Sequence, residues 1–166
     1  MEFVLVIVIG AVIYGTIFLI TNKKKTEMMD SGKIIERGKD YIKQAHFFTT
    51  KTASLADVGN AMDKTVLAEQ NISLEPDYTK NVIVFRYANI AGMFIATLRF
   101  MGEENEQYKY RFQIDRWQGK NGAFPHEYTG NVLLTAVEKA FMKLDGTTAV
   151  ERVMASYTQK TKTSFI

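Results

Sequence analysis

The 166-residue sequence contains no cysteine and only two histidines. The lack of cysteine excludes disulfides, thiolate metal sites and cysteine nucleophiles. His46 and His126 each lack the second histidine or carboxylate at the spacing that a metal site requires. The Gly-Lys-Asn-Gly stretch at 119–122 lacks the spacing of a phosphate-binding loop, and no nucleophile elbow or paired-carboxylate motif occurs. We therefore predict no metal, no cofactor and no catalytic residue.

The sequence also has little net charge outside one short segment. Of its 21 basic residues, three are the consecutive Lys23, Lys24 and Lys25, and one of its 18 acidic residues is Glu2. Residues 27–166 therefore carry 18 basic and 17 acidic side chains. A nearly neutral domain lacks the electrostatic footprint of a nucleic-acid binder, so nucleic acid is not an expected partner.

The sequence does have a long apolar run at its start. Residues 3–20 contain no charged side chain, and as a helix they would span about 27 Å, enough for a thin hydrocarbon core. We predict an uncleaved transmembrane anchor over 1–22, followed by a basic juxtamembrane linker over 23–31. Lysine-rich flanks stay cytoplasmic, so Lys23, Lys24 and Lys25 are expected to contact lipid headgroups. This predicts a single-pass cell-membrane protein with its N-terminus outside and its domain in the cytoplasm.

The early Glu2 and the apolar run resemble, over residues 2–20, the start of a type IV pilin. The sequence departs from that family's pattern because no basic leader ending in glycine precedes Phe3 and because the lysine triplet interrupts the helix. The resemblance implies an alternative function, a filament or surface subunit with its domain outside the cell. Ala11 and Gly15 form a small-xxx-small pair, through which two such helices could associate into a homo-oligomer.

Residues 32–158 are predicted to form an α+β domain, and 159–166 a polar tail. The spacing of apolar residues predicts helices at 31–45, from Ser54 onward, at 131–145 and from Thr148 onward, where Ser54–Asp57 and Thr148–Glu151 have the capping-box pattern. Between them, the alternation from Val82 to Trp117 predicts three strands. The expected architecture is an antiparallel β-meander of three to four strands, covered on one face by helices.

The alternation divides the predicted meander into two faces. One face is apolar and is expected to pack against the helices; it carries Ile83, Phe85, Tyr87, Phe94, Ala96, Leu98, Phe100, Tyr108, Tyr110, Phe112 and Ile114. The other face carries Met93, Ile95, Thr97 and Gln113 together with four basic residues: Arg86, Arg99, Lys109 and Arg111. Such a face is commonly just solvated, but it could also accept an acidic partner, a headgroup or a phosphate ligand.

A second candidate site is the stretch that follows the third strand. Trp117 falls on the polar phase of that strand, beside a loop that carries Phe124, His126 and Tyr128. Grouped aromatic residues at a strand end can form a recognition site, and they can equally cap a core. The first hypothesis is therefore a membrane-anchored, non-enzymatic cytoplasmic interaction or ligand-binding module, accessory to a membrane assembly, with an acidic protein partner. The alternatives are the pilin-like subunit and a small enzyme that uses the 119–131 loop.

Overall fold

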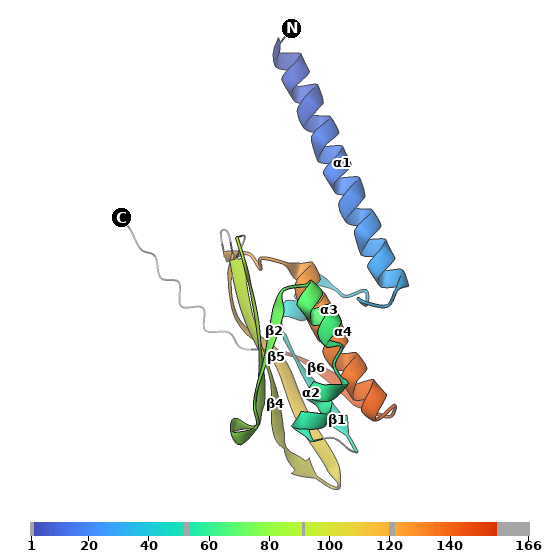
Figure 1. Cartoon of the computed structure of the whole chain (residues 1–166), viewed down its shortest axis with the longest axis vertical. Coiled ribbons are helices and arrows are strands. Elements are labelled where there is room, and N and C mark those ends of the chain that lie inside the picture. The colour runs from blue at the N-terminus through green and yellow to red at the C-terminus, as the bar shows by residue number, and fades with distance from the viewer. Residues whose placement is uncertain (1, 52–53, 91, 120–121, 156–166) are drawn as a thin grey trace, which may run out of the picture. The chain divides into compact units, whose positions relative to one another are not determined.

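The computed structural model describes residues 2–51, 54–90, 92–119 and 122–155 (Figure 1). The chain divides into two compact units, residues 1–36 and residues 37–166. The predicted tail at 159–166 lies outside the described residues. Each unit is described separately below.

The first unit consists of one helix, α1 (Glu2–Asp30), and the turn that follows it. Contrary to the prediction, the helix does not end before the lysines but continues through Lys23–Lys25, where Lys23 pairs with Glu27 one turn later at 3.9 Å. In the described part of the chain, none of the helices is sufficiently long and apolar to traverse a lipid bilayer. The prediction of a transmembrane anchor is therefore wrong, and residues 23–30 continue the helix. The association of two chains through Ala11 and Gly15 stays a prediction.

The second unit is built on one sheet of six strands, in which every neighbouring pair is antiparallel. The strand order across the sheet is β2-β3-β4-β5-β1-β6. The bounds are β1 (Gln44–Thr50), β2 (Ile72–Asp77), β3 (Val82–Asn89), β4 (Gly92–Glu104), β5 (Gln107–Gly119) and β6 (Ala149–Met154).

The predicted meander is confirmed as the strands β3, β4 and β5. Phe85 lies opposite Ala96, and Leu98 lies opposite Phe112, as the alternation requires. The predicted apolar face is buried, with Phe85, Leu98 and Phe112 at most 1 % exposed. The expected count of three to four strands is too low, because β1, β2 and β6 extend the sheet on both sides of the meander.

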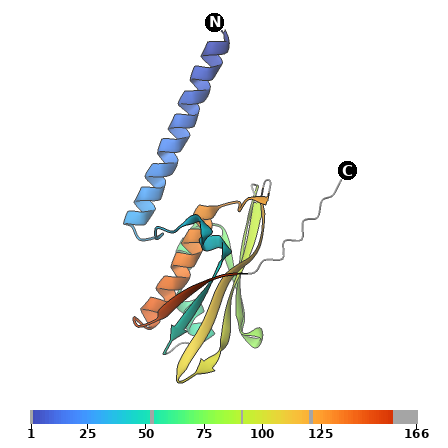
Figure 2. The same ribbon diagram turned by 180° about the vertical axis from the view of Figure 1, so that it is seen from behind.

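Three helices cover the apolar face of the sheet: α2 (Leu55–Ala61), α3 (Lys64–Glu69) and α4 (Glu127–Leu144) (Figures 1 and 2). The predicted capping box at Ser54 and Asp57 is present and starts α2, as that sequence pattern favours. α4 supplies most of the helical core; its Phe141 stacks on Phe48 of β1, with ring centroids 4.4 Å apart. Among the described residues of the second unit, no helix lies on the opposite face, which we call the outer face (Figures 1 and 2).

Two of the predicted helices do not form. In place of a helix over 31–45, the structure has a left-handed Gly32 (φ 67°), a short 3-10 helix η1 (Lys39–Lys43) and the start of β1. In place of a helix from Thr148, it has β6, which pairs with β1. The predicted capping box at Thr148 does not form, because the Thr148 hydroxyl instead donates to the carbonyl of Asp145 at 2.8 Å. After Thr148, pairing of β6 with the distant strand β1 outweighs the local helix signal.

Candidate functional site

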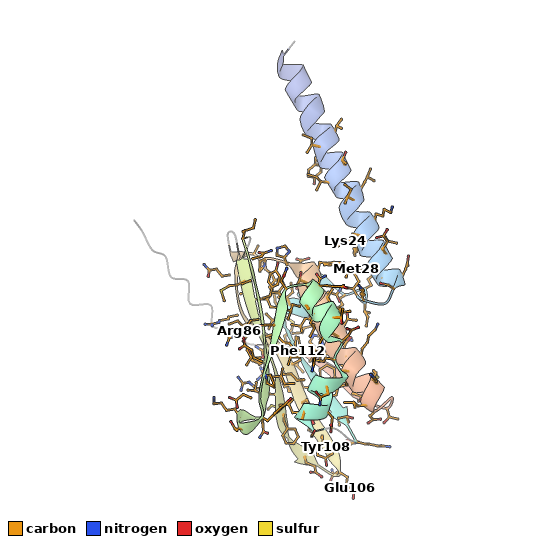
Figure 3. All side chains as sticks on the ribbon, viewed as in Figure 1. Lys24, Met28, Arg86, Glu106, Tyr108 and Phe112 are labelled. Atoms are coloured by element: carbon orange, nitrogen blue, oxygen red, sulfur yellow. The ribbon has the colours of Figure 1, made fainter. Side chains whose placement is uncertain are left out.

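The outer face carries all four predicted basic residues, and only Arg99 and Arg111 are direct cross-strand partners. Arg86 lies opposite Ile95, Arg99 opposite Arg111, and Lys109 of β5 opposite Thr49 of β1. These pairings place the basic side chains on three neighbouring strands, on the face away from α2, α3 and α4, as the alternation predicts. Among the residues that Figure 3 labels, Arg86 lies on the outer face and Phe112 lies in the core.

Arg99 and Arg111 are the central pair of this face. They are direct cross-strand partners on β4 and β5, and side chains in such positions start about 4.5–5.5 Å apart. Arg99 is exposed, and within the described ranges no carboxylate pairs with it. Arg111 contacts the side-chain oxygen of Gln113, and its guanidinium lies 5.9 Å from the ring centroid of Phe47. The Nε of Arg111 is buried and has no hydrogen-bond partner in the described structure.

The other two predicted residues are paired with acidic side chains. Arg86 donates to Glu75 of β2 at 2.8 Å, and Lys109 pairs with Glu104 near the tip of the β4–β5 hairpin. All four side chains are about half exposed, and such ion pairs contribute little to stability. Among these four residues, Arg99 and Arg111 therefore carry the positive charge that no described carboxylate neutralises.

A β-bulge adds a fifth basic residue that the sequence analysis missed. Ile95 pairs with Arg116, but the next residue, Ala96, pairs with Ile114, so Asp115 is the extra residue. A bulge reverses the facing of the residues beyond it. Arg116 thus joins Ile95 and Arg86 in one cross-strand row on the outer face. The dipeptide Asp-Arg in an otherwise regular alternation gives no sequence signal for this shift.

The same bulge turns Trp117 to the inner face, contrary to the prediction. Trp117 lies opposite Phe94, packs edge-to-face on Phe124 with ring centroids 5.9 Å apart, and donates from its indole to the carbonyl of Gly122 at 3.1 Å. Phe124 in turn stacks on Phe94 at 5.1 Å. These aromatic residues close one end of the core.

The remaining predicted loop residues belong to the same end of the sheet. His126, at the start of α4, packs edge-to-face on Tyr87 with ring centroids 5.3 Å apart, and its Nε2 lies 2.8 Å from the side-chain Nδ2 of Asn89. Tyr128 lies in the first turn of α4 with its hydroxyl buried. The structure thus brings Trp117, Phe124 and His126 together as part of the packing around the core.

A buried polar cluster that the sequence analysis did not identify lies between α4 and the sheet. Arg37 donates to Glu138 with two nitrogens, one of them at 3.1 Å, to Asn131 at 3.0 Å and to Thr135 at 3.4 Å. The Arg37 side chain is 5 % exposed and that of Glu138 is 9 % exposed. The signal in the sequence was the polar series Asn131, Thr135 and Glu138, which recurs at helical spacing within the apolar stripe of α4.

His46 of β1 borders this cluster and is almost completely buried, at 1 % exposure. Its Nδ1 lies 4.0 Å from the carboxylate of Glu138, beyond hydrogen-bond distance, and neither ring nitrogen has a hydrogen-bond partner in the described structure. Burial lowers the pKa of His46 to about 4, although the Glu138 carboxylate opposes that shift. The imidazole is therefore neutral near pH 7.

Within the described ranges, no group of three histidine or acidic side chains could hold a metal ion. Comparison with known proteins adds no further constraint on the site. No protein-family description matches the chain, and no curated protein matches it.

Proposed function

We propose that the protein is a binding module whose outer sheet face takes an acidic segment of a partner protein. The observation that carries this proposal is the Arg99–Arg111 pair. Like charges directly opposite each other on a sheet destabilise it, and no described carboxylate relieves this pair. A partner carboxylate would relieve it, because a guanidinium donates two parallel hydrogen bonds to a carboxylate.

The chemistry of the face favours an acidic protein segment over nucleic acid. Residues 27–166 are nearly neutral, whereas a phosphate backbone is bound by an extended basic surface. Phe47 lies beneath the guanidinium of Arg111, so the aromatic platform that would stack a base is already covered. Ile95 and Thr97 lie beside the arginines at 6 % exposure each, and they give the face a partly apolar floor.

The proposal is tested with a fluorescent octaglutamate peptide and the full-length protein, purified in a non-ionic detergent. We expect wild-type binding that weakens steeply with salt, as for any charge-driven association. Arg99→Glu should raise the Kd roughly tenfold, which corresponds to about 1.4 kcal/mol.

The matched control is Lys139→Glu, which changes the net charge by the same amount on an exposed position of α4, in the helical layer. Its Kd should stay within about twofold of the wild-type value, because the removed charge lies on the opposite side of the domain. Equal weakening by both variants would show that binding depends on the net charge of the protein and not on the outer face. Absence of wild-type binding at low salt would refute the proposal.

A further inference from the structure

The buried polar cluster attaches the first residues of the second unit to α4. Arg37 is the first residue of that unit, and four of its hydrogen bonds reach Asn131, Thr135 and Glu138 along one face of α4. Four residues later, the hydroxyl of Tyr41 donates to the carbonyl of Glu127 at the start of the same helix. Residues 37–43 are thus fixed to α4 at two points.

Glu138 is the only described carboxylate that pairs with this cluster, and three basic side chains surround it. Arg37 binds it directly, Arg152 of β6 approaches its Oε1 at 3.7 Å, and His46 of β1 approaches the same oxygen at 4.0 Å. The other groups around His46 are uncharged: the backbone of Tyr41 from η1 and the ring of Phe112 from β5, 6.4 Å from the imidazole.

Protonation of His46 would therefore place a third positive charge beside one negative charge. The imidazolium would also be buried without hydrogen-bond partners in its present position. A buried charge lacking such partners is strongly unfavourable. The low pKa of His46 expresses this cost. The cost falls if the cluster opens, because water can then solvate the imidazolium.

We propose that the Arg37–Glu138–His46 cluster is an acid-sensitive latch, which holds residues 37–43 on α4 at neutral pH and releases them on acidification. In the closed state His46 is neutral and Arg37 occupies the carboxylate of Glu138. In the open state His46 takes up a proton and Arg37 leaves α4. This inference is independent of the binding function proposed for the outer face, because the cluster lies on the inner side of the sheet.

Hydrogen exchange of the full-length protein, corrected for the intrinsic pH dependence of exchange, tests the latch. Between pH 7 and pH 5, the equilibrium constant for opening of residues 37–46 should increase roughly 20-fold. This is the increase expected if the imidazole pKa is about 6.5 in the open state and about 4 in the closed state. Protection in β3 and β4 should persist at pH 5, because the release is local.

His46→Leu removes the titrating group and should abolish the pH dependence of exchange in residues 37–46. The matched control is His126→Leu, which removes the other histidine of the chain and should leave that dependence intact. The wild-type protein supplies a second readout that needs no variant, the NMR titration of the His46 ring. The latch is refuted by an imidazole pKa of 6 or higher, by equal pH dependence in wild type and His46→Leu, or by protection lost throughout the domain at once.

Discussion

Arg99 lies directly opposite Arg111 across the β4–β5 pairing, on the face of the sheet that no described helix of the second unit covers. The pair has no carboxylate partner in the described chain. On the same face, Arg86 forms an ion pair with Glu75 and Lys109 forms one with Glu104. A cross-strand pair of like charges lowers stability by a few tenths of a kcal/mol or more. Such a cost is easiest to understand where the charges are used for binding.

Arg99→Glu should therefore stabilise the isolated protein while it weakens binding. The substitution replaces a repulsive cross-strand pair by an attractive one, and the free energy of unfolding should rise by about 0.2–1 kcal/mol. Urea unfolding of the full-length protein measures this change. A loss of stability of more than about 1 kcal/mol would show that Arg99 has a structural role.

Phe112→Ala should lower the free energy of unfolding by about 3–5 kcal/mol, because it removes a large side chain that is 1 % exposed in the core. The control is Asp115→Ala in the same strand, at the exposed extra residue of the bulge, where we expect a change within about 0.5 kcal/mol. Similar penalties at 112 and 115 would mean that the strand register is wrong.

The stability of the protein should depend on the ionisation of His46. Its pKa is about 4 when folded and near 6.5 when unfolded, so the folded state binds fewer protons between these values. The stability that neutral His46 contributes is fully present above pH 6.5. As the pH falls to 4 it is lost, which lowers the free energy of unfolding by about 3 kcal/mol in total. Urea unfolding at several pH values should show this slope in the wild-type protein and a shallower one in His46→Leu. Parallel slopes would exclude His46 as the source.

Residues 37–166 should fold without residues 1–36, because they contain the whole sheet, its helical layer and the buried core cluster. Circular dichroism should show one cooperative thermal transition of the truncated protein. A broad, non-cooperative loss of signal would mean that the second unit requires the first one to fold.

The central meander and α4 could be predicted from the sequence because each has a strong periodicity of its own. Val82–Asn89 alternates with period two, and the apolar stripe of α4 recurs at helical spacing. The strands β1 and β6 could not be found in this way, because their pairing with each other joins segments about a hundred residues apart. The residues within each of these two strands do not carry that information by themselves.

The candidate site was predictable to the same extent. Arg99 and Arg111 follow from the alternation, whereas Arg116 and Trp117 change face at a bulge that only the pairing reveals. The Arg37–Glu138 pair joins residues 101 positions apart, and a single sequence does not show such a contact. The apolar run at the start suggested a membrane span, but α1 continues through the lysines and no described helix meets the requirement for such a span.

The most direct test of the binding function is an NMR titration of the full-length, isotope-labelled protein with the octaglutamate peptide. Our account predicts the largest shifts at the side-chain Nε–Hε signals of Arg99 and Arg111 and at the amides of Thr97 and Gln113, which form the neighbouring cross-strand pair on the same face. Signals of the exposed α4 residue Lys139 should stay unchanged. Shifts confined to α4, or spread evenly over all lysines and arginines, would contradict the assignment of the outer sheet face as the binding surface.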